Sequence, residues 1–168
     1  VQRFLDTYDL PWNFDQTLAK VYELEAQILA QGVNLKKGAK NLLTYLQKEG
    51  VPIALATSSV ESRARMILDS NGILSLFDHL VFAKDVKRSK PYPDIFLKAC
   101  SDLNVLPENC LVLEDSEAGI EAASRAGIPV ICIPDLKIPA QSFLNKTEQV
   151  FQDLDAVRDY LESKKEVF

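Results

Sequence analysis

The chain has 168 residues, 47% of them hydrophobic and 26% charged, with a formal net charge of -5 and a pI near 5.0. This length suits one sizeable core with a small appendage. The acidic balance, without a basic stripe interleaved with aromatic residues, argues against a nucleic-acid partner. No apolar run reaches the length of a membrane span, so no membrane partner is expected.

Apolar residues recur at two spacings along the chain. Helical spacing marks segments that end at a glycine or a polar turn, and short continuous apolar runs mark buried strands. In chain order we predict helix 15–31, helix 39–49, strand 51–57, helix 58–70, strand 79–83, helix 93–103, strand 110–114, helix 116–126, strand 128–133 and helix 154–162. Strands that alternate with helices in this way indicate βαβ units, and therefore an α/β fold with a parallel sheet covered on both faces.

The helix that follows the first strand carries a recognisable start signal. Ser58 and Glu61 have the Ser-x-x-Glu spacing of a capping box, in which the serine hydroxyl and the glutamate satisfy free amides. The spacing predicts a helix that begins at Ser58 or Ser59.

The three cysteines, Cys100, Cys110 and Cys132, lie within apolar or helical patterns and show no CxxC spacing. An odd number without that spacing predicts free, buried thiols rather than disulfides or a metal site. Free thiols are typical of a reducing compartment, so we expect a cytoplasmic protein.

Polar side chains follow each of the first three predicted strands. Right-handed crossovers bring the C-terminal ends of parallel strands to one edge, which is where ligands bind in such folds. Hydroxyls, basic residues and carboxylates should therefore meet there. The residues are Thr57, Ser58 and Ser59, then Lys84, Lys87, Arg88 and Lys90, then Glu114 and Asp115.

Each group also has a purely structural interpretation. The hydroxyls after the first strand can cap the next helix, a role compatible with an anion site at the same helix end. The basic residues of the second loop are ordinarily solvated charges. Lys90 differs from the others because it precedes Pro91, which restricts its backbone.

The adjacent carboxylates Glu114 and Asp115 leave two alternatives. In the first, Asp115 or Ser116 caps the next helix while Glu114 points to solvent. In the second, both carboxylates share a cation, which requires the chain to leave the strand at Glu114 because successive strand residues face opposite ways. Close like charges need such a cation, and Mg²⁺ is the natural oxygen-seeking occupant.

Three stretches in this order, ALATSS at 54–59, SKPYPDIF at 89–96 and LVLEDSEAGIEAASRAGIPV at 111–130, resemble the haloacid dehalogenase-like hydrolases. Within that superfamily they are most similar to the branch of β-phosphoglucomutase and small-molecule phosphatases. The resemblance implies a three-layer, Rossmann-like α/β core at 34–168, preceded at 1–33 by the C-terminal part of a helical cap.

The resemblance also implies a reaction, transfer of a phosphoryl group from a small phosphorylated metabolite through an aspartyl-phosphate. Thr57 and Lys90 would be catalytic, the first bonding to the transferring phosphoryl group and the second neutralising its charge. The remaining implied site residues are Ser58 and Ser59 for the substrate, and Glu114 and Asp115 for Mg²⁺.

One feature of the family is absent from this sequence. The nucleophile and its acid/base partner belong to a DxDG-like stretch after an N-terminal strand, whereas Asp6, Asp9 and Asp15, the aspartates before Thr57, follow no strand pattern. We therefore expect a fragment that is inactive alone and needs a missing N-terminal segment, or a second copy, to complete its sheet.

Two other functions compete with this interpretation. The alternative from a different class is a non-catalytic interaction domain that keeps the fold. A phosphorylation-signalling receiver also gathers carboxylates, a hydroxyl and Lys-Pro at strand ends. The order here, with the hydroxyl first and the carboxylates last, argues against a receiver.

Overall fold

The computed structural model describes residues 2–9 and 11–165, and the chain divides into two units, Val1–Asn34 and Leu35–Phe168. The first unit contains helices α1 (Gln2–Thr7) and α2 (Phe14–Ala30). The Asn13 side chain accepts the N–H of Gln16 at 3.1 Å and so caps α2. The helix predicted over 15–31 is confirmed. Much of its apolar pattern is exposed, at Val21, Tyr22, Leu24 and Ile28.

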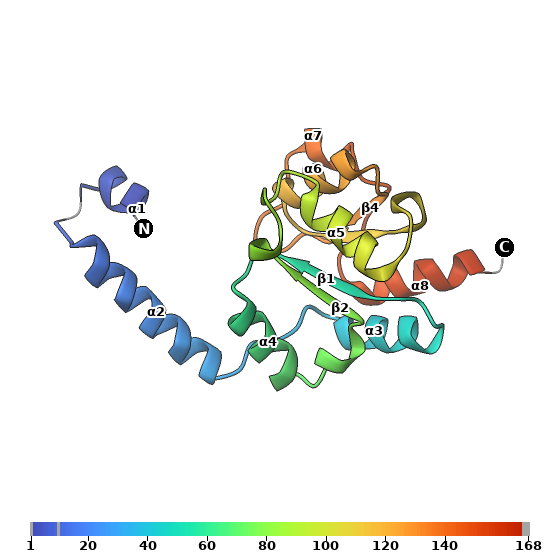
Figure 1. The fold of residues 1–168 in the computed structure, drawn as a ribbon, viewed down its shortest axis with the longest axis horizontal. Helices are drawn as coiled ribbons and strands as arrows, with labels where there is room; N and C mark the ends of the chain where they lie inside the picture. The colour runs from blue at the N-terminus through green and yellow to red at the C-terminus, as the bar shows by residue number, and fades with distance from the viewer. Residues whose placement is uncertain (1, 10, 166–168) are drawn as a thin grey trace. The chain divides into compact units, whose positions relative to one another are not determined.

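The second unit alternates strands and helices, which confirms the α/β class (Figure 1). Its helices are α3 (Ala39–Lys48), α4 (Glu61–Ser70), α5 (Asp94–Leu103), α6 (Glu117–Ala126), α7 (Gln141–Leu144) and α8 (Leu154–Lys165). Its strands are β1 (Ala54–Thr57), β2 (His79–Phe82), β3 (Val112–Glu114), β4 (Val130–Cys132) and β5 (Gln149–Val150). The sequence pattern predicted neither α7 nor β5, which are short and carry no apolar run of their own.

The strands form two parallel sheets rather than one. β1 pairs with β2, with Thr57 opposite Phe82, and β4 lies between β3 and β5, with Glu114 opposite Cys132. Among the described residues, β1 has no other strand partner and neither does β3. Each sheet therefore has an edge at a strand that carries a predicted site residue.

Alternation along β4 divides the core into two layers. Val130 and Cys132 pack with side chains of α5 and α6, whereas Ile131 and Ile133 pack with Leu42 of α3 and Val157 of α8. All seven of these core side chains, including Ile120 of α6, are at least 97% buried. The sheet of β3, β4 and β5 thus has helices on both faces, as a parallel sheet requires.

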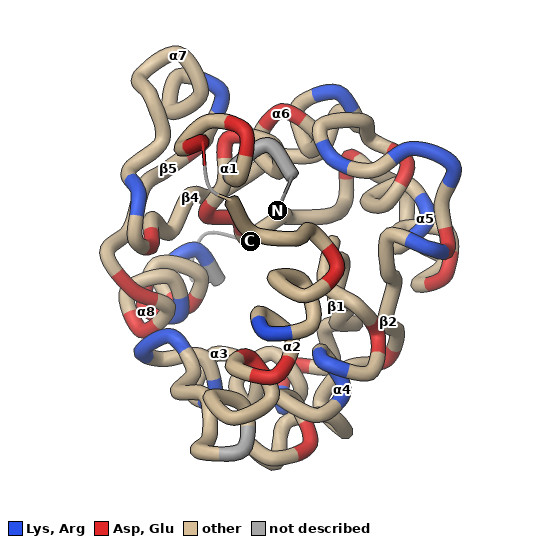
Figure 2. The backbone as a smooth tube through the Cα atoms, turned by 90° about the vertical axis from the view of Figure 1, so that its left-hand side faces the viewer, with Lys and Arg blue, Asp and Glu red and all other residues tan. Residues whose placement is uncertain are grey.

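The structure can be compared with the predictions made from composition, which concern free cysteines, the distribution of charge and membrane spans. Cys100, Cys110 and Cys132 are free, with the first and third buried and the second half-buried. Lysines, arginines and acidic residues are interspersed along the backbone (Figure 2). Within the described part of the chain, no helix combines the length and the apolar character needed to cross a bilayer.

Candidate active site

The candidate site lies where β1 and β3 end. Lys90, in the loop between β2 and α5, contacts both strand ends: its Nζ donates to the Ala56 carbonyl at 3.2 Å and forms an ion pair with Glu114 Oε1. The two charged side chains are only 12% and 7% exposed. The Nζ also lies 4.7 Å from the centre of the Phe96 ring. One buried cation therefore joins the ends of both sheets, as the predicted convergence at the strand ends requires.

The second oxygen of the Glu114 carboxylate is fully engaged by the next turn of the chain. Oε2 accepts the backbone N–H of Asp115 at 2.8 Å and, from Ser116, the N–H at 2.9 Å and the hydroxyl at 3.0 Å. Burial by itself would raise the pKa of Glu114. The Lys90 charge and these donors outweigh burial and hold the pKa below its usual value.

These contacts bear on the two alternatives for Glu114 and Asp115, helix capping with Glu114 in solvent or a cation shared by both carboxylates. Ser116 does cap α6, because its hydroxyl oxygen accepts the Gly119 N–H at 3.0 Å. The accompanying expectation that Glu114 points to solvent is wrong, since the residue is 9% exposed. Helix capping and the buried ion pair coexist.

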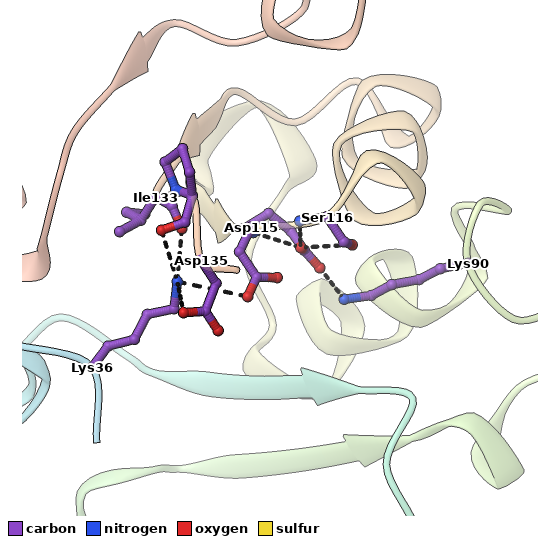
Figure 3. A network of polar contacts seen from close by, with 8 residues as sticks. Lys36, Lys90, Asp115, Ser116, Ile133 and Asp135 are labelled. Atoms are coloured by element: carbon purple, nitrogen blue, oxygen red, sulfur yellow. Dashed lines mark hydrogen bonds and ion pairs between the residues drawn. The ribbon is translucent and has the colours of Figure 1, made fainter. Parts of the chain in front are cut away.

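Asp115 faces a different cation from Glu114 (Figure 3). Its Oδ2 lies 3.7 Å from Lys36 Nζ, which is also 3.8 Å from Asp135 Oδ1. The same ammonium donates to the carbonyls of Ile133 at 2.8 Å and Pro134 at 3.3 Å. Burial and the neighbouring Glu114 charge raise the pKa of Asp115, and Lys36 partly offsets them.

The oxygens around Lys36 have the chemistry that Mg²⁺ prefers, two carboxylates and two carbonyls already directed at a cation. The Glu114 oxygens, in contrast, are committed to Lys90 and the start of α6. Across residues 2–9 and 11–165, no group of three or more His, Cys, Asp or Glu side chains is arranged to hold a metal ion. The donor chemistry thus fits Mg²⁺ at Asp115, with most of the coordination shell left to water or to other groups.

The hydroxyls after β1 are arranged differently from the capping-box prediction, which is wrong. The helix begins at Glu61 with Val60 as its N-cap, and Val60 makes no side-chain cap bond. Glu61 instead pairs with Arg65 and Lys84, so Lys84 is not simply solvated. Ser59 donates its backbone N–H to Thr57 Oγ1 at 3.0 Å. This turn leaves Thr57 half-buried at the strand end and Ser58 exposed.

Two residues that surround Asp115, Lys36 and Asp135, were not predicted as site residues from the sequence. Asp135 follows the apolar run of β4, and the rule that pointed to Glu114 and Asp115 could have found it. No such signal marks Lys36, whose contacts with Ile133 and Pro134 lie 97 and 98 residues away in the chain. Its role depends on tertiary structure.

Comparison with known proteins places the chain in a family. Residues 1–133 match the family described as haloacid dehalogenase-like hydrolase. The chain belongs to the haloacid dehalogenase-like hydrolases. The resemblance seen in the three sequence stretches is thereby confirmed.

Individual relatives agree with the predicted branch of the family. The chain is 34% identical over 165 residues to the "Probable pseudouridine-5'-phosphatase" of Drosophila melanogaster, covering 94% of this chain and 69% of the relative. It is 40% identical over 121 residues to the validoxylamine A 7'-phosphate phosphatase of Streptomyces hygroscopicus subsp. limoneus, covering 72% of this chain and 56% of the relative.

Solved structures agree with the fold as well. A Thermotoga maritima protein provisionally assigned as a β-phosphoglucomutase superimposes with a TM-score of 0.84 at 25% identity, covering 95% of this chain and 74% of that one. The haloacid dehalogenase-like chain described here thus spans between half and three quarters of the length of these three proteins.

Proposed function

We propose that the full-length protein is a Mg²⁺-dependent phosphoryl-transfer hydrolase, a phosphatase or phosphomutase, acting on a small phosphorylated metabolite through an aspartyl-phosphate. Family membership supports this proposal, and so do the relatives, which are named as phosphatases of small phosphorylated compounds. The three free cysteines are consistent with a cytoplasmic location.

The observation that carries the proposal is the placement of Lys90. Its ammonium is held by Glu114 and the Ala56 carbonyl, one residue before Thr57 at the end of β1. A cation fixed in advance at the strand end that carries Thr57 can neutralise charge as it develops on a transferring phosphoryl group. We assign Thr57 and Lys90 to that group, and Ser58 and Ser59 to substrate binding.

The metal-binding part of the proposal concerns Glu114 and Asp115. Asp115 has a carboxylate available beside Lys36, whereas Glu114 is occupied by Lys90, so we assign Asp115 the direct contact and Glu114 the supporting position. When bound, Mg²⁺ would supply positive charge to the phosphoryl oxygens. The Lys36 ammonium would then move away from the Asp115 carboxylate, because the metal ion would occupy its position.

The nucleophile must come from outside the described strands. We propose that an aspartate-bearing N-terminal segment of the full-length protein, or a strand from a second copy, pairs between β1 and β3 and completes the site. Their edges, which have no second strand partner among the described residues, support this arrangement. The two helices within residues 1–33 would belong to the C-terminal part of a helical cap.

The test measures phosphate release from p-nitrophenyl phosphate and a panel of sugar phosphates by the full-length protein, with and without Mg²⁺. We expect turnover that Lys90→Ala lowers about 10² to 10³-fold in kcat, as removal of a preorganised charge typically does. Lys87→Ala, an exposed lysine in the same loop, is the matched control and should leave turnover unchanged.

The 168-residue chain, assayed in parallel, should release no phosphate above a protein-free blank, because it lacks the proposed nucleophile. Turnover by this chain that Lys90→Ala abolishes would contradict the nucleophile assignment. A full-length protein inert toward every phosphate ester would favour the alternative, a non-catalytic interaction domain.

A further inference from the structure

Gly119, the third residue of α6, lies directly against the Glu114 carboxylate. A Cβ built on Gly119 would fall 2.0 Å from both Cδ and Oε1 of Glu114 and 2.5 Å from Oε2. Carbon atoms that are not bonded to each other normally lie about 3.5 to 4.0 Å apart. Any side chain at position 119 would therefore occupy the space that the Glu114 carboxylate fills.

The backbone itself does not require glycine at this position. The five glycines with positive φ are Gly32, Gly38, Gly50, Gly72 and Gly127, whereas Gly119 has helical backbone geometry inside α6. Glycine within a helix costs about 0.5 to 1 kcal/mol relative to alanine. Helix propensity thus disfavours glycine at position 119. The space that glycine leaves for the Glu114 carboxylate offsets this cost.

A flexible glutamate could in principle swing away from an added methyl group. Glu114 is not free to do so, because the carboxylate is buried and holds Lys90, two backbone amides and the Ser116 hydroxyl. A shift large enough to clear a Cβ would break several of these contacts. Lys90 would then lose the carboxylate that fixes its ammonium.

We propose that Gly119 is a positioning residue: by lacking a side chain, it leaves the room in which Glu114 lies and thereby sets the position of the Lys90 ammonium. This inference rests on the proposed function for its catalytic meaning, since Lys90 acts on a phosphoryl group only in that reaction. Its structural content is independent of turnover and can be tested separately.

The first test is the sign of a stability change in the full-length protein. Gly119→Ala should lower the urea midpoint, although glycine to alanine in a helix ordinarily raises it. In a background with both Lys90→Met and Glu114→Ala, the space is vacant and the same substitution should leave the midpoint unchanged or raise it. Comparing Ser124→Gly with Ser124→Ala, at an exposed position of α6, measures the difference in urea midpoint between glycine and alanine where no side chain is in the way.

The second test reads out Lys90 and needs no enzyme activity. Acetylation with acetic anhydride, followed by mass spectrometry, compares Lys90 with the exposed Lys87 as an internal reference. Lys90 should be labelled slowly in the unmodified protein and about tenfold faster in Gly119→Ala, a change equivalent to about 1.4 kcal/mol. This measurement decides the matter even if the paired background fails to fold.

The third test links the position to the reaction. In the full-length protein, Gly119→Ala should lower kcat about tenfold or more with little change in KM, because the lost contact acts on the transition state. Absence of turnover in the unmodified protein would refute the proposed function and leave the labelling test intact. Unchanged Lys90 labelling together with a raised urea midpoint would overturn the role of Gly119.

Discussion

At the scale of single residues, the adjacent carboxylates Glu114 and Asp115 have different counter-ions because β3 ends between them. Val112 packs toward α5 and α6 and Leu113 toward α3 and α8, so Glu114 points to the same side as Val112. Asp115 lies beyond the strand and faces Lys36. Two neighbouring charges are thereby tolerated through separate cations instead of a shared one.

This division predicts how the 168-residue chain binds Mg²⁺. Calorimetry should show weak binding, because only two carboxylates, those of Asp115 and Asp135, face the Lys36 position among the described residues, and water must complete the shell. Asp115→Asn should remove most of the binding. Equal binding by that variant would indicate that Asp115 merely adjoins the cap of α6.

Lys36 should compete with the metal for the same oxygens. Lys36→Met is expected to tighten Mg²⁺ binding about threefold, since the long, partly exposed ion pairs that it forms with Asp115 and Asp135 are each worth under about 1 kcal/mol. The control is Lys37→Met, which removes the pair with Asp153 instead. If both variants bind Mg²⁺ equally, Lys36 does not occupy the site in solution.

At the scale of elements, the start of α8 is fixed against the turn before α3. Lys37 accepts the Leu154 N–H on its carbonyl at 3.0 Å, and its Nζ pairs with Asp153 at 2.7 Å. Gly38, between Lys37 and α3, has φ of +82°. A Cβ there would lie 2.2 Å from the Asp155 nitrogen and 2.7 Å from the Leu154 carbonyl carbon, both backbone atoms.

Gly38→Ala should therefore destabilise the protein strongly. The left-handed backbone costs an alanine about 1 to 2 kcal/mol, and the clash with backbone that cannot rotate away adds to it, for a total above about 3 kcal/mol. Gly72→Ala is the matched control, because Gly72 has φ of +64° and open space around it. Urea denaturation of both variants should separate strain from clash, and equal losses would rule out the clash.

The same junction predicts a pH dependence of stability. The bonds from Lys37 and from the Ala156 N–H hold the pKa of Asp153 below its usual value. A depressed carboxyl pKa stabilises the folded state above the unfolded pKa of about 3.9, and the benefit disappears as pH falls through the folded pKa. Asp153→Asn should thus lower the urea midpoint at pH 7 and make little difference at pH 2.5.

Asp159→Asn provides the comparison for Asp153→Asn, because Asp159 is an exposed residue of α8 paired with Arg158. Its effect on the midpoint should be small at every pH. A loss in Asp153→Asn that stays constant from pH 7 to pH 2.5 would show that the carboxylate charge is not responsible.

At the scale of the whole molecule, the alternation of strands and helices can be predicted from the sequence, because hydrophobic spacing and helix-stop residues mark each element locally. The helix predicted over 116–126 is found at Glu117–Ala126, closed by Gly127 as expected. The predicted start of α4 at Ser58 or Ser59 is wrong because the Glu61 carboxylate pairs with Arg65 and Lys84 and makes no capping box. Lys36 and Gly119 could not be assigned, since their roles depend on atoms that only the tertiary structure brings close.

The burial of the strands distinguishes a complete sheet edge from an incomplete one. A strand of a covered parallel sheet is buried throughout, as β4 is, whereas all four residues of β1 are only half-buried. β1 also lacks a strand partner on one side among the described residues. A backbone N–H or C=O at such an edge costs about 1 to 3 kcal/mol if it is shielded from water and has no hydrogen-bond partner. Several such groups would cancel most of the total stability of an ordinary domain, about 5 to 15 kcal/mol.

We therefore predict that the 168-residue chain accepts an added strand between β1 and β3. A peptide carrying the aspartate-bearing strand that we propose should bind it, slow amide exchange in β1, raise the unfolding midpoint and confer the proposed phosphatase activity. A peptide with its aspartates replaced by asparagine is the control: it should protect β1 equally but restore no activity, because only the nucleophile differs. Light scattering during the titration distinguishes peptide binding from a strand exchanged between two copies. A stable monomer whose β1 amides and midpoint do not change on mixing would show that the two sheets need no further strand.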